Sequence, residues 1–93
     1  MSDYLPRPWN PRLYVARGRY SGLIKIGISE RIEQRMKTLT ADLLFTLDHD
    51  CHARSLERDL HSRFSSYREY GEWFRNEGEL ASFIAMHCDS PVN

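Results

Sequence analysis

Residues 13–28 run Leu-Tyr-Val-Ala-Arg-Gly-Arg-Tyr-Ser-Gly-Leu-Ile-Lys-Ile-Gly-Ile. The apolar and aromatic residues 13–16 are typical of a β-strand, and residues 23–28 form a second apolar run that alternates around Lys25. The intervening residues 18–22 contain two glycines and have the length of a hairpin turn. The sequence therefore predicts two antiparallel strands joined by a short turn.

A short helix is predicted directly after this hairpin. Ser29 is a residue type that commonly caps helix N-termini. Apolar residues then recur at helical spacing, at Ile32, Met36 and Leu39. This pattern predicts an amphipathic helix over residues 30–39.

The rest of the chain predicts one more strand and two more helices. Residues 43–47 suit the strand. Residues 71–74 mark a break whose two large aromatic residues are expected to pack against the final helix, with stacking on nucleic-acid bases as the alternative. The helices are expected over residues 52–66 and about 77–87, with apolar stripes formed by Ala53, Leu56, Leu60 and Phe64 in the first and by Leu80, Phe83 and Ile84 in the second. The expected fold is α/β of the α+β type, a small central antiparallel three-stranded sheet flanked by helices in the order β-β-α-β-α-α.

Length and composition indicate a single domain. The chain has 93 residues, 41% hydrophobic and 28% charged, which suffices for one modest core and is ordinary for a soluble globular protein. No apolar run approaches the roughly 20 residues of a membrane span and no signal peptide is visible, so a cytoplasmic location without a membrane partner is expected. We expect an irregular arm at residues 1–11, the domain at 12–88 and a tail at 89–93. Cys51 and Cys88 are then expected to be free thiols.

The two halves of the chain differ in charge although the whole chain is neutral. Residues 1–37 contain eight Lys and Arg against three Asp and Glu, a net charge of +5, so the remainder carries −5. A basic half can bind phosphate locally even in a neutral protein, although two solvated charged faces explain the asymmetry about as well. In the first case Arg17, Arg31 and Lys37 are candidate contacts to a nucleic acid.

Glu57 and His61 lie next to each other on the second predicted helix. At about 100° per residue both fall on the shoulder of the apolar stripe, where a carboxylate is unfavourable unless it is paired or binds a metal. Two interpretations stay open. Periodicity alone favours a Glu57–His61 or Glu57–Arg pair that closes the rim of the core, and the other interpretation is a metal ligand.

Three further polar side chains also have ordinary structural explanations. Arg35, on the shoulder of the first helix, belongs to a type that commonly extends along the surface, and Tyr14 suits half-buried packing in a strand. Lys25 interrupts an apolar strand, so it points either to the open face of the sheet or into a pocket. None of the three indicates a function by itself.

In combination, these residues resemble the GIY-YIG endonucleases. Residues 13–15 (Leu-Tyr-Val) and 25–27 (Lys-Ile-Gly) are similar to the two strand motifs of that family. Arg35 lies eight residues after Gly27, where the family has an arginine on the first helix. The later segment Leu-Glu-Arg-Asp-Leu at residues 56–60 resembles the context of the family's metal-binding glutamate.

One branch of the family is especially similar. Its pattern corresponds here to Lys25-Ile26-Gly27, then Glu57-x-x-Leu60-His61-x-x-Phe64, then Gly71-Glu72-Trp73-Phe74. This branch is compact, is abundant in phages and large DNA viruses, and is related to fungal meiotically up-regulated proteins. The resemblance covers about residues 12–75, and it therefore includes most of the chain.

The resemblance implies a metal-dependent endonuclease that hydrolyses DNA phosphodiester bonds. Glu57 would hold one Mg²⁺ or Mn²⁺ ion. Arg35 would stabilise the charge that builds on the phosphate, and Tyr14 would orient or deprotonate the attacking water. Lys25 would lower the pKa of the tyrosine or contact phosphate, and His61 would contact phosphate or water.

Two other functions are weighed against the nuclease. Leu39 stands where many active relatives have Tyr or His, and Glu69 or Glu72 lies where many have a bracing asparagine, for which Asn76 is only a loose candidate. These departures motivate a catalytically weak DNA-binding module. The small size and zero net charge motivate a phage-type protein that inhibits a host protein through the same fold.

The expected partner of the nuclease is DNA. With few basic residues in one domain, sequence-specific recognition would need a homodimer or an added reader domain. DNA structure rather than DNA sequence is therefore the expected determinant of cleavage. A phage-encoded enzyme of this kind would act in the cytoplasm of its bacterial host.

A zinc site is the remaining candidate. Cys51-His52 and His87-Cys88, with His49 nearby, could in principle converge on one ion. None of their spacings matches a zinc finger or a zinc ribbon. Histidines in polar loops without such spacing are the favoured interpretation.

Overall fold

The computed structural model describes residues 10–47 and 52–88. The predicted arm lies almost wholly outside this part of the chain, and the predicted tail lies wholly outside it. No helix in the described part is long and apolar enough to cross a membrane. In chain order the elements are β1 (Arg12–Gly18), β2 (Ile24–Ser29), α1 (Ile32–Leu39), β3 (Ala41–Leu47), α2 (Ala53–Arg63), the 3-10 turn η2 (Ser65–Tyr67), β4 (Arg68–Tyr70), β5 (Trp73–Phe74) and α3 (Gly78–Cys88).

The sheet has five antiparallel strands in the order β3-β1-β2-β5-β4, so the prediction of three strands was wrong. The predicted hairpin is confirmed, with Tyr14 opposite Gly27 and Ala16 opposite Lys25. Of the two additional strands, β4 lies directly before the predicted break at residues 71–74, in a segment where no element was predicted, and β5 lies within that break. They contain three and two residues, which is too short for an alternating apolar pattern to appear.

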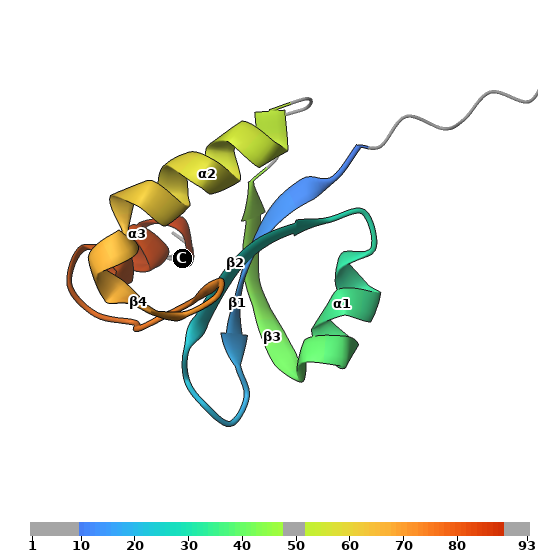
Figure 1. The fold of residues 1–93 in the computed structure, drawn as a ribbon. Helices are drawn as coiled ribbons and strands as arrows, with labels where there is room; N and C mark the ends of the chain where they lie inside the picture. Colours follow the sequence, from blue (N-terminus) through green and yellow to red (C-terminus); the bar gives the residue numbers. More distant parts are fainter. Residues whose placement is uncertain (1–9, 48–51, 89–93) are drawn as a thin grey trace, which may run out of the picture.

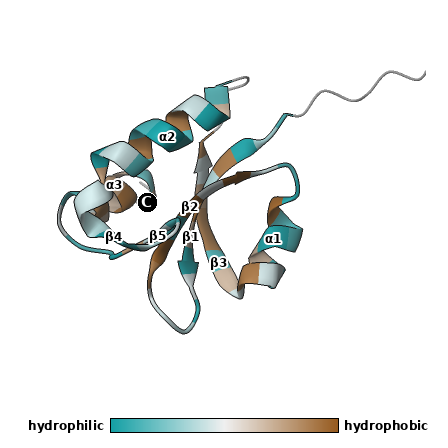
Figure 2. Cartoon of the chain, in the orientation of Figure 1, coloured by the Kyte–Doolittle hydropathy of each residue, from teal (hydrophilic) through white to brown (hydrophobic). Residues whose placement is uncertain are grey.

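The two faces of the sheet carry different helices. Because strand residues alternate, Leu13 and Val15 face α2 and α3 and contribute to the main apolar cluster, whereas Tyr14 and Ala16 face α1 in a smaller cluster. Figure 1 shows this arrangement, with α1 on one side of the sheet and α2 and α3 on the other. Figure 2 shows hydrophobic segments along the strands between the helices and hydrophilic segments on α1 and α2.

The three helices agree with the predicted patterns, except at the start of α1 and at the end of α2, which stops at Arg63 rather than at residue 66. Ser29 does not cap α1, because it ends β2 three residues before α1 starts at Ile32, and its hydroxyl accepts the N–H of Arg31 (2.9 Å). The predicted stripes of the other two helices are confirmed, since Leu60 and Leu80 are among their buried members.

The two aromatic residues of the predicted break separate onto opposite faces. Phe74 is fully buried in the main cluster with residues of α3, as expected. Trp73, its neighbour on β5, packs against the Tyr14 cluster on the α1 face, so the prediction that both rings pack against the last helix was wrong for Trp73. The cause is that successive side chains of a strand point to opposite faces of the sheet. The sequence of this segment did not predict a strand.

Gly78 fixes the start of α3. Its φ of +58° lies in the left-handed region, and an added Cβ would clash with the ring of Tyr67, whose hydroxyl accepts the N–H of Glu79 (3.0 Å). We expect Gly78→Ala to lower the free energy of unfolding by roughly 2 kcal/mol or more, since backbone strain and displacement of Tyr67 add together. Urea unfolding tests this prediction. The control is Gly71→Ala, at φ +56° with open space around it, which keeps the strain without the clash and should therefore lose less.

Candidate functional site

The candidate site lies at the outer edge of β2, just beyond the end of β5. On β2, this short strand pairs only with Ile24 and Lys25. At the next residue, the N–H of Ile26 donates to the carbonyl of Glu72 (3.2 Å), and the carbonyl of Ile26 accepts from Nε2–H of His61 on α2 (2.8 Å). Side chains that start from both faces of the sheet therefore meet at this edge.

Four of the predicted site residues line one hollow at this edge, which we call the Tyr14 hollow. Tyr14 comes from β1, Lys25 from β2, Arg35 from α1 and Glu57 from α2. The hollow measures about 350 Å³, which is within the range of small-ligand sites. Its complete lining is Tyr14, Lys25, Ile28, Arg35, Arg54, Glu57 and Glu72.

Gly27 allows Tyr14 to occupy its place in this hollow. The two residues face each other across the β1–β2 pair, and a Cβ added at Gly27 would lie only 2.7 Å from the Tyr14 hydroxyl oxygen. Any larger residue would therefore displace the phenol. The close approach of Tyr14 thus explains why the second strand motif has a glycine at this position.

The hydroxyl of Tyr14 is protonated at neutral pH. Only 2% of this residue is exposed, and burial, assisted by the nearby carboxylates of Glu72 and Glu57, raises the pKa of Tyr14 to about 12, although Arg35 opposes this shift. The phenol can therefore orient a water molecule by hydrogen bonding, and it is a poor base in the metal-free protein.

Lys25 points into the hollow rather than to open solvent. Its ammonium lies 3.0 Å from the carboxylate of Glu72, and its side chain is 15% exposed. The same ammonium lies 5.4 Å from the ring centroid of Trp73, within the range of a cation–π contact. The sequence left two orientations open for the Lys25 side chain, and the structure has the one that points into a pocket.

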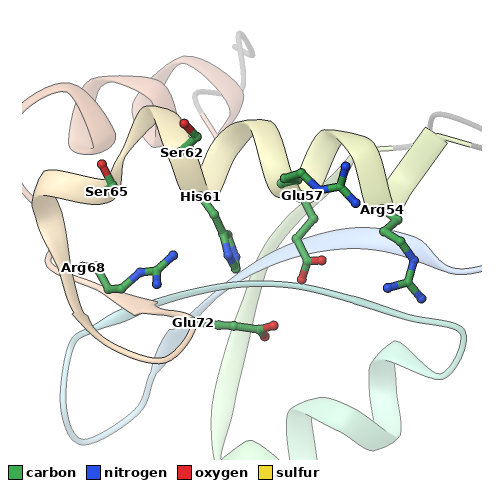
Figure 3. Close-up of a pocket in the computed structure, with 8 residues that line it drawn as sticks. Arg54, Glu57, His61, Ser62, Ser65, Arg68 and Glu72 are labelled. Carbon is green, nitrogen blue, oxygen red and sulfur yellow. The ribbon is translucent and has the colours of Figure 1, made fainter.

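Glu57, His61 and Glu72 form a group that could hold a metal ion. One potential ligand atom from each residue lies within 4.8 Å of the others. Figure 3 shows Glu57 and His61 directed from α2 toward Glu72. The pKa of Glu57 is raised by burial and by the charge of Glu72 and a hydrogen bond to it, while His61 and Arg54 lower it. A divalent cation would relieve this crowding of two carboxylates, so the donor set fits a metal.

His61 has a defined tautomer in this arrangement. A carbonyl oxygen can only accept, so the contact to Ile26 places the proton on Nε2. In a neutral ring with this tautomer, the lone pair lies on Nδ1. Metal-binding histidines commonly donate their other N–H to a backbone carbonyl in this way.

The structure separates the three predicted nucleic-acid contacts. Arg31 lines a small hollow beside Arg35 on α1. Lys37, on the same helix, lines a different hollow with Arg19, and Arg17 is exposed on β1. Of these three residues, Arg31 is thus the one that the described structure places in a hollow with a residue of the candidate site.

Two residues at the site were missed by sequence reasoning as participants. Glu72 was noted only as standing where relatives have an asparagine, and Arg54 was not considered. The signal for Arg54 was present, because it precedes Glu57 by three residues and His61 by seven, which is the spacing of one helix face. The approach of Glu72 depends on how β5 pairs with β2, and no local pattern predicts that pairing.

No support for a zinc site appears in the described residues. The group of Glu57, His61 and Glu72 is the only cluster of potential ligands found there. His87 instead stacks on Phe45, with ring centroids 4.9 Å apart, and Cys88 is a free exposed thiol as predicted. Cys51 and His49 lie outside the described residues.

Comparison with known proteins gives one result. A family model described as the T5orf172 domain matches residues 12–87. No curated protein and no solved structure matches the chain. The matched range contains every element of the described structure except the last residue of α3.

Proposed function

Because the chain belongs to the T5orf172 domain family, a GIY-YIG-related nuclease family, we propose that it is a metal-dependent endonuclease that hydrolyses DNA phosphodiester bonds. One observation carries this proposal. Tyr14, Lys25, Arg35 and Glu57 come from four separate elements and line a single hollow. Core packing gives no reason for four polar side chains of these types to converge there.

One Mg²⁺ or Mn²⁺ ion is the proposed cofactor, held by Glu57 together with Glu72 and His61. When bound, the ion polarises the scissile phosphate and stabilises the leaving oxygen. An imidazole ligand suits transition metals better than magnesium, which prefers oxygen donors. Mn²⁺ is therefore expected to support more activity than Mg²⁺ when each is tested alone.

The other residues of the hollow act on the phosphate and on water. The Arg35 guanidinium matches phosphate oxygens and stabilises the charge that develops during attack. Tyr14 holds the attacking water by a hydrogen bond. Lys25 adds positive charge beside the phosphate and, through its 3.0 Å ion pair, keeps Glu72 in place.

The finer identity of the enzyme is also a proposal. From its Lys-Ile-Gly, Glu-x-x-Leu-His-x-x-Phe and Gly-Glu-Trp-Phe segments, we propose that it belongs to the compact branch of phages and large DNA viruses. Such an enzyme would act in the cytoplasm of a bacterial host. DNA structure, rather than base sequence, would determine where it cuts.

Plasmid nicking tests the proposed function. The wild-type protein, Glu57→Ala and Arg35→Ala are compared at low salt with Mg²⁺ or Mn²⁺. Wild-type nicking that disappears in both variants is the expected result. The matched controls are Asp59→Ala, an exposed carboxylate two residues from Glu57, and Arg19→Ala, which loses only an exposed ion pair with Asp42. A folded wild-type protein that cuts no form of DNA with either metal would refute the enzyme and leave a binding or inhibitory module.

Gly27→Ala should reduce nicking by roughly 10- to 100-fold, because a new Cβ displaces the Tyr14 hydroxyl and small misplacements of a catalytic group have effects of this size. Initial rates of plasmid nicking measure this loss. Gly22→Ala is the control, since it strains the same hairpin at φ +75° but meets no neighbouring atom within 4 Å. Equal losses in the two variants would mean that the hairpin, and not the position of Tyr14, sets the rate.

A further inference from the structure

A second hollow is lined by the three residues of the candidate metal group and not by Tyr14. We call it the Arg58 hollow, and it measures about 660 Å³. Its lining is Arg54, Glu57, Arg58, His61, Ser62, Ser65, Arg68 and Glu72. Three of these residues, Arg54, Glu57 and Glu72, also line the Tyr14 hollow. The two hollows are therefore contiguous through the candidate metal group.

The Arg58 hollow has the character of an anion site. Three arginines and two glutamates line it, so its side chains carry a net charge of +1 with both carboxylates ionised and His61 neutral. Any divalent cation held by the glutamates would make the hollow more positive still. The hydroxyls of Ser62 and Ser65 add neutral donors of the kind that contact phosphate oxygens.

Two of the arginines are available to a ligand. In the part of the chain that the structure describes, neither Arg58 nor Arg68 is paired with a carboxylate. Arg58 is exposed on α2. Arg68 is exposed on β4, where its guanidinium carbon lies 5.6 Å from the ring centroid of Phe74, and Figure 3 shows it on the His61 side of the hollow.

From this geometry we infer that the Arg58 hollow binds the DNA backbone next to the scissile phosphate, with Arg58 and Arg68 each contacting a phosphate of the same strand. The inference rests on the proposed function, because it needs the scissile phosphate to lie in the Tyr14 hollow. A strand that enters one hollow must pass the shared residues Glu57 and Glu72 to reach the other. Neither arginine belongs to the basic N-terminal half, so net charge along the sequence would not have located this surface.

DNA binding without cleavage tests the inference. Fluorescence anisotropy with a short labelled duplex, recorded in EDTA so that no metal-dependent cutting occurs, gives the Kd and its dependence on salt. Arg58→Ala and Arg68→Ala should each raise the Kd about fivefold and lower the slope of log Kd against log salt by about 0.9, the contribution of one phosphate contact. Arg63→Ala is the control on the same helix, because Arg63 packs over Phe64 and does not line the hollow.

Nicking kinetics separate this inference from the proposed function. The same two variants should raise KM and leave kcat within about twofold, since they hold DNA without touching the reacting phosphate. Unchanged Kd and salt slope in both variants, with a wild-type protein that still nicks, would overturn the subsite and leave the nuclease intact. A wild-type protein that neither binds nor nicks DNA would overturn both. Because Arg58 is exposed, Arg58→Ala should fold even if Arg68→Ala disturbs the short strand β4.

Discussion

Glu57→Gln should abolish plasmid nicking, by about 1,000-fold or more, and at the same time raise the melting temperature of the metal-free protein by a few degrees. The loss follows because the variant removes the central proposed ligand of the metal. The gain follows because Glu57 lies against Glu72 in a partly buried place, where burial and the second carboxylate raise its pKa. A residue that weakens the fold in this way is typical of a functional site.

The raised pKa of Glu57 determines the direction in which the stability difference between Glu57→Gln and wild type changes with pH. The raised pKa means that the folded protein binds the Glu57 proton more tightly than the unfolded chain does. The contribution of Glu57 to stability should therefore be greatest below the ordinary glutamate pKa of about 4.3 and should be lost as the pH rises through the raised pKa. Glutamine does not titrate, so the difference in melting temperature between Glu57→Gln and wild type should grow over this window and then stay constant.

Added Mn²⁺ connects the two effects. It should raise the melting temperature of the wild type at neutral pH, because a ligand that binds only the folded state stabilises it, and it should have little effect on Glu57→Gln. Asp59→Asn serves as the control, since this carboxylate is exposed on the same helix and should keep both nicking and the response to Mn²⁺. If Glu57→Gln still nicks, or if Asp59→Asn fails in the same way, the metal is not held where we place it.

The sequence correctly predicted those elements of the fold that are determined within short segments. The hairpin around Lys25 and the apolar stripes of α2 and α3 were correct because periodicity and turn residues are properties of short segments. The prediction failed where pairing between distant segments decides the outcome. Two residues on β5 cannot reveal a strand, and Ser29 continued β2 instead of capping α1.

In the candidate site, too, the features set by local spacing were predicted and those set by strand pairing were not. The adjacency of Glu57 and His61 follows from helical spacing, and it was predicted. The contribution of Glu72 requires β5 to pair with β2 and then to end at the edge where His61 bonds to Ile26. Charge counting had the opposite weakness, because it selected the basic N-terminal half, whereas the three arginines that line the Arg58 hollow lie on α2 and β4.

Arg35→Ala should reduce kcat for nicking by about 100- to 1,000-fold, the usual loss when a group that stabilises developing charge is removed. Arg35 lines the Tyr14 hollow, and its positive charge lowers the pKa of Tyr14 against the stronger effect of burial. Removing it leaves both the phosphate and the phenol without this cation. Arg35→Lys should recover only part of the loss, because an ammonium does not reproduce the guanidinium fork on a phosphate.

The response of Arg35→Ala to metal distinguishes charge stabilisation from a damaged site. Arg35 is exposed on α1 and does not belong to the group of Glu57, His61 and Glu72, so the rise in melting temperature with Mn²⁺ should match that of the wild type. Arg31→Ala is the closest comparison, because Arg31 shares a hollow with Arg35 and does not line the Tyr14 hollow. It should raise KM and preserve kcat. Equal losses of kcat in the two variants would show that α1 only attracts DNA, and that the scissile phosphate lies elsewhere.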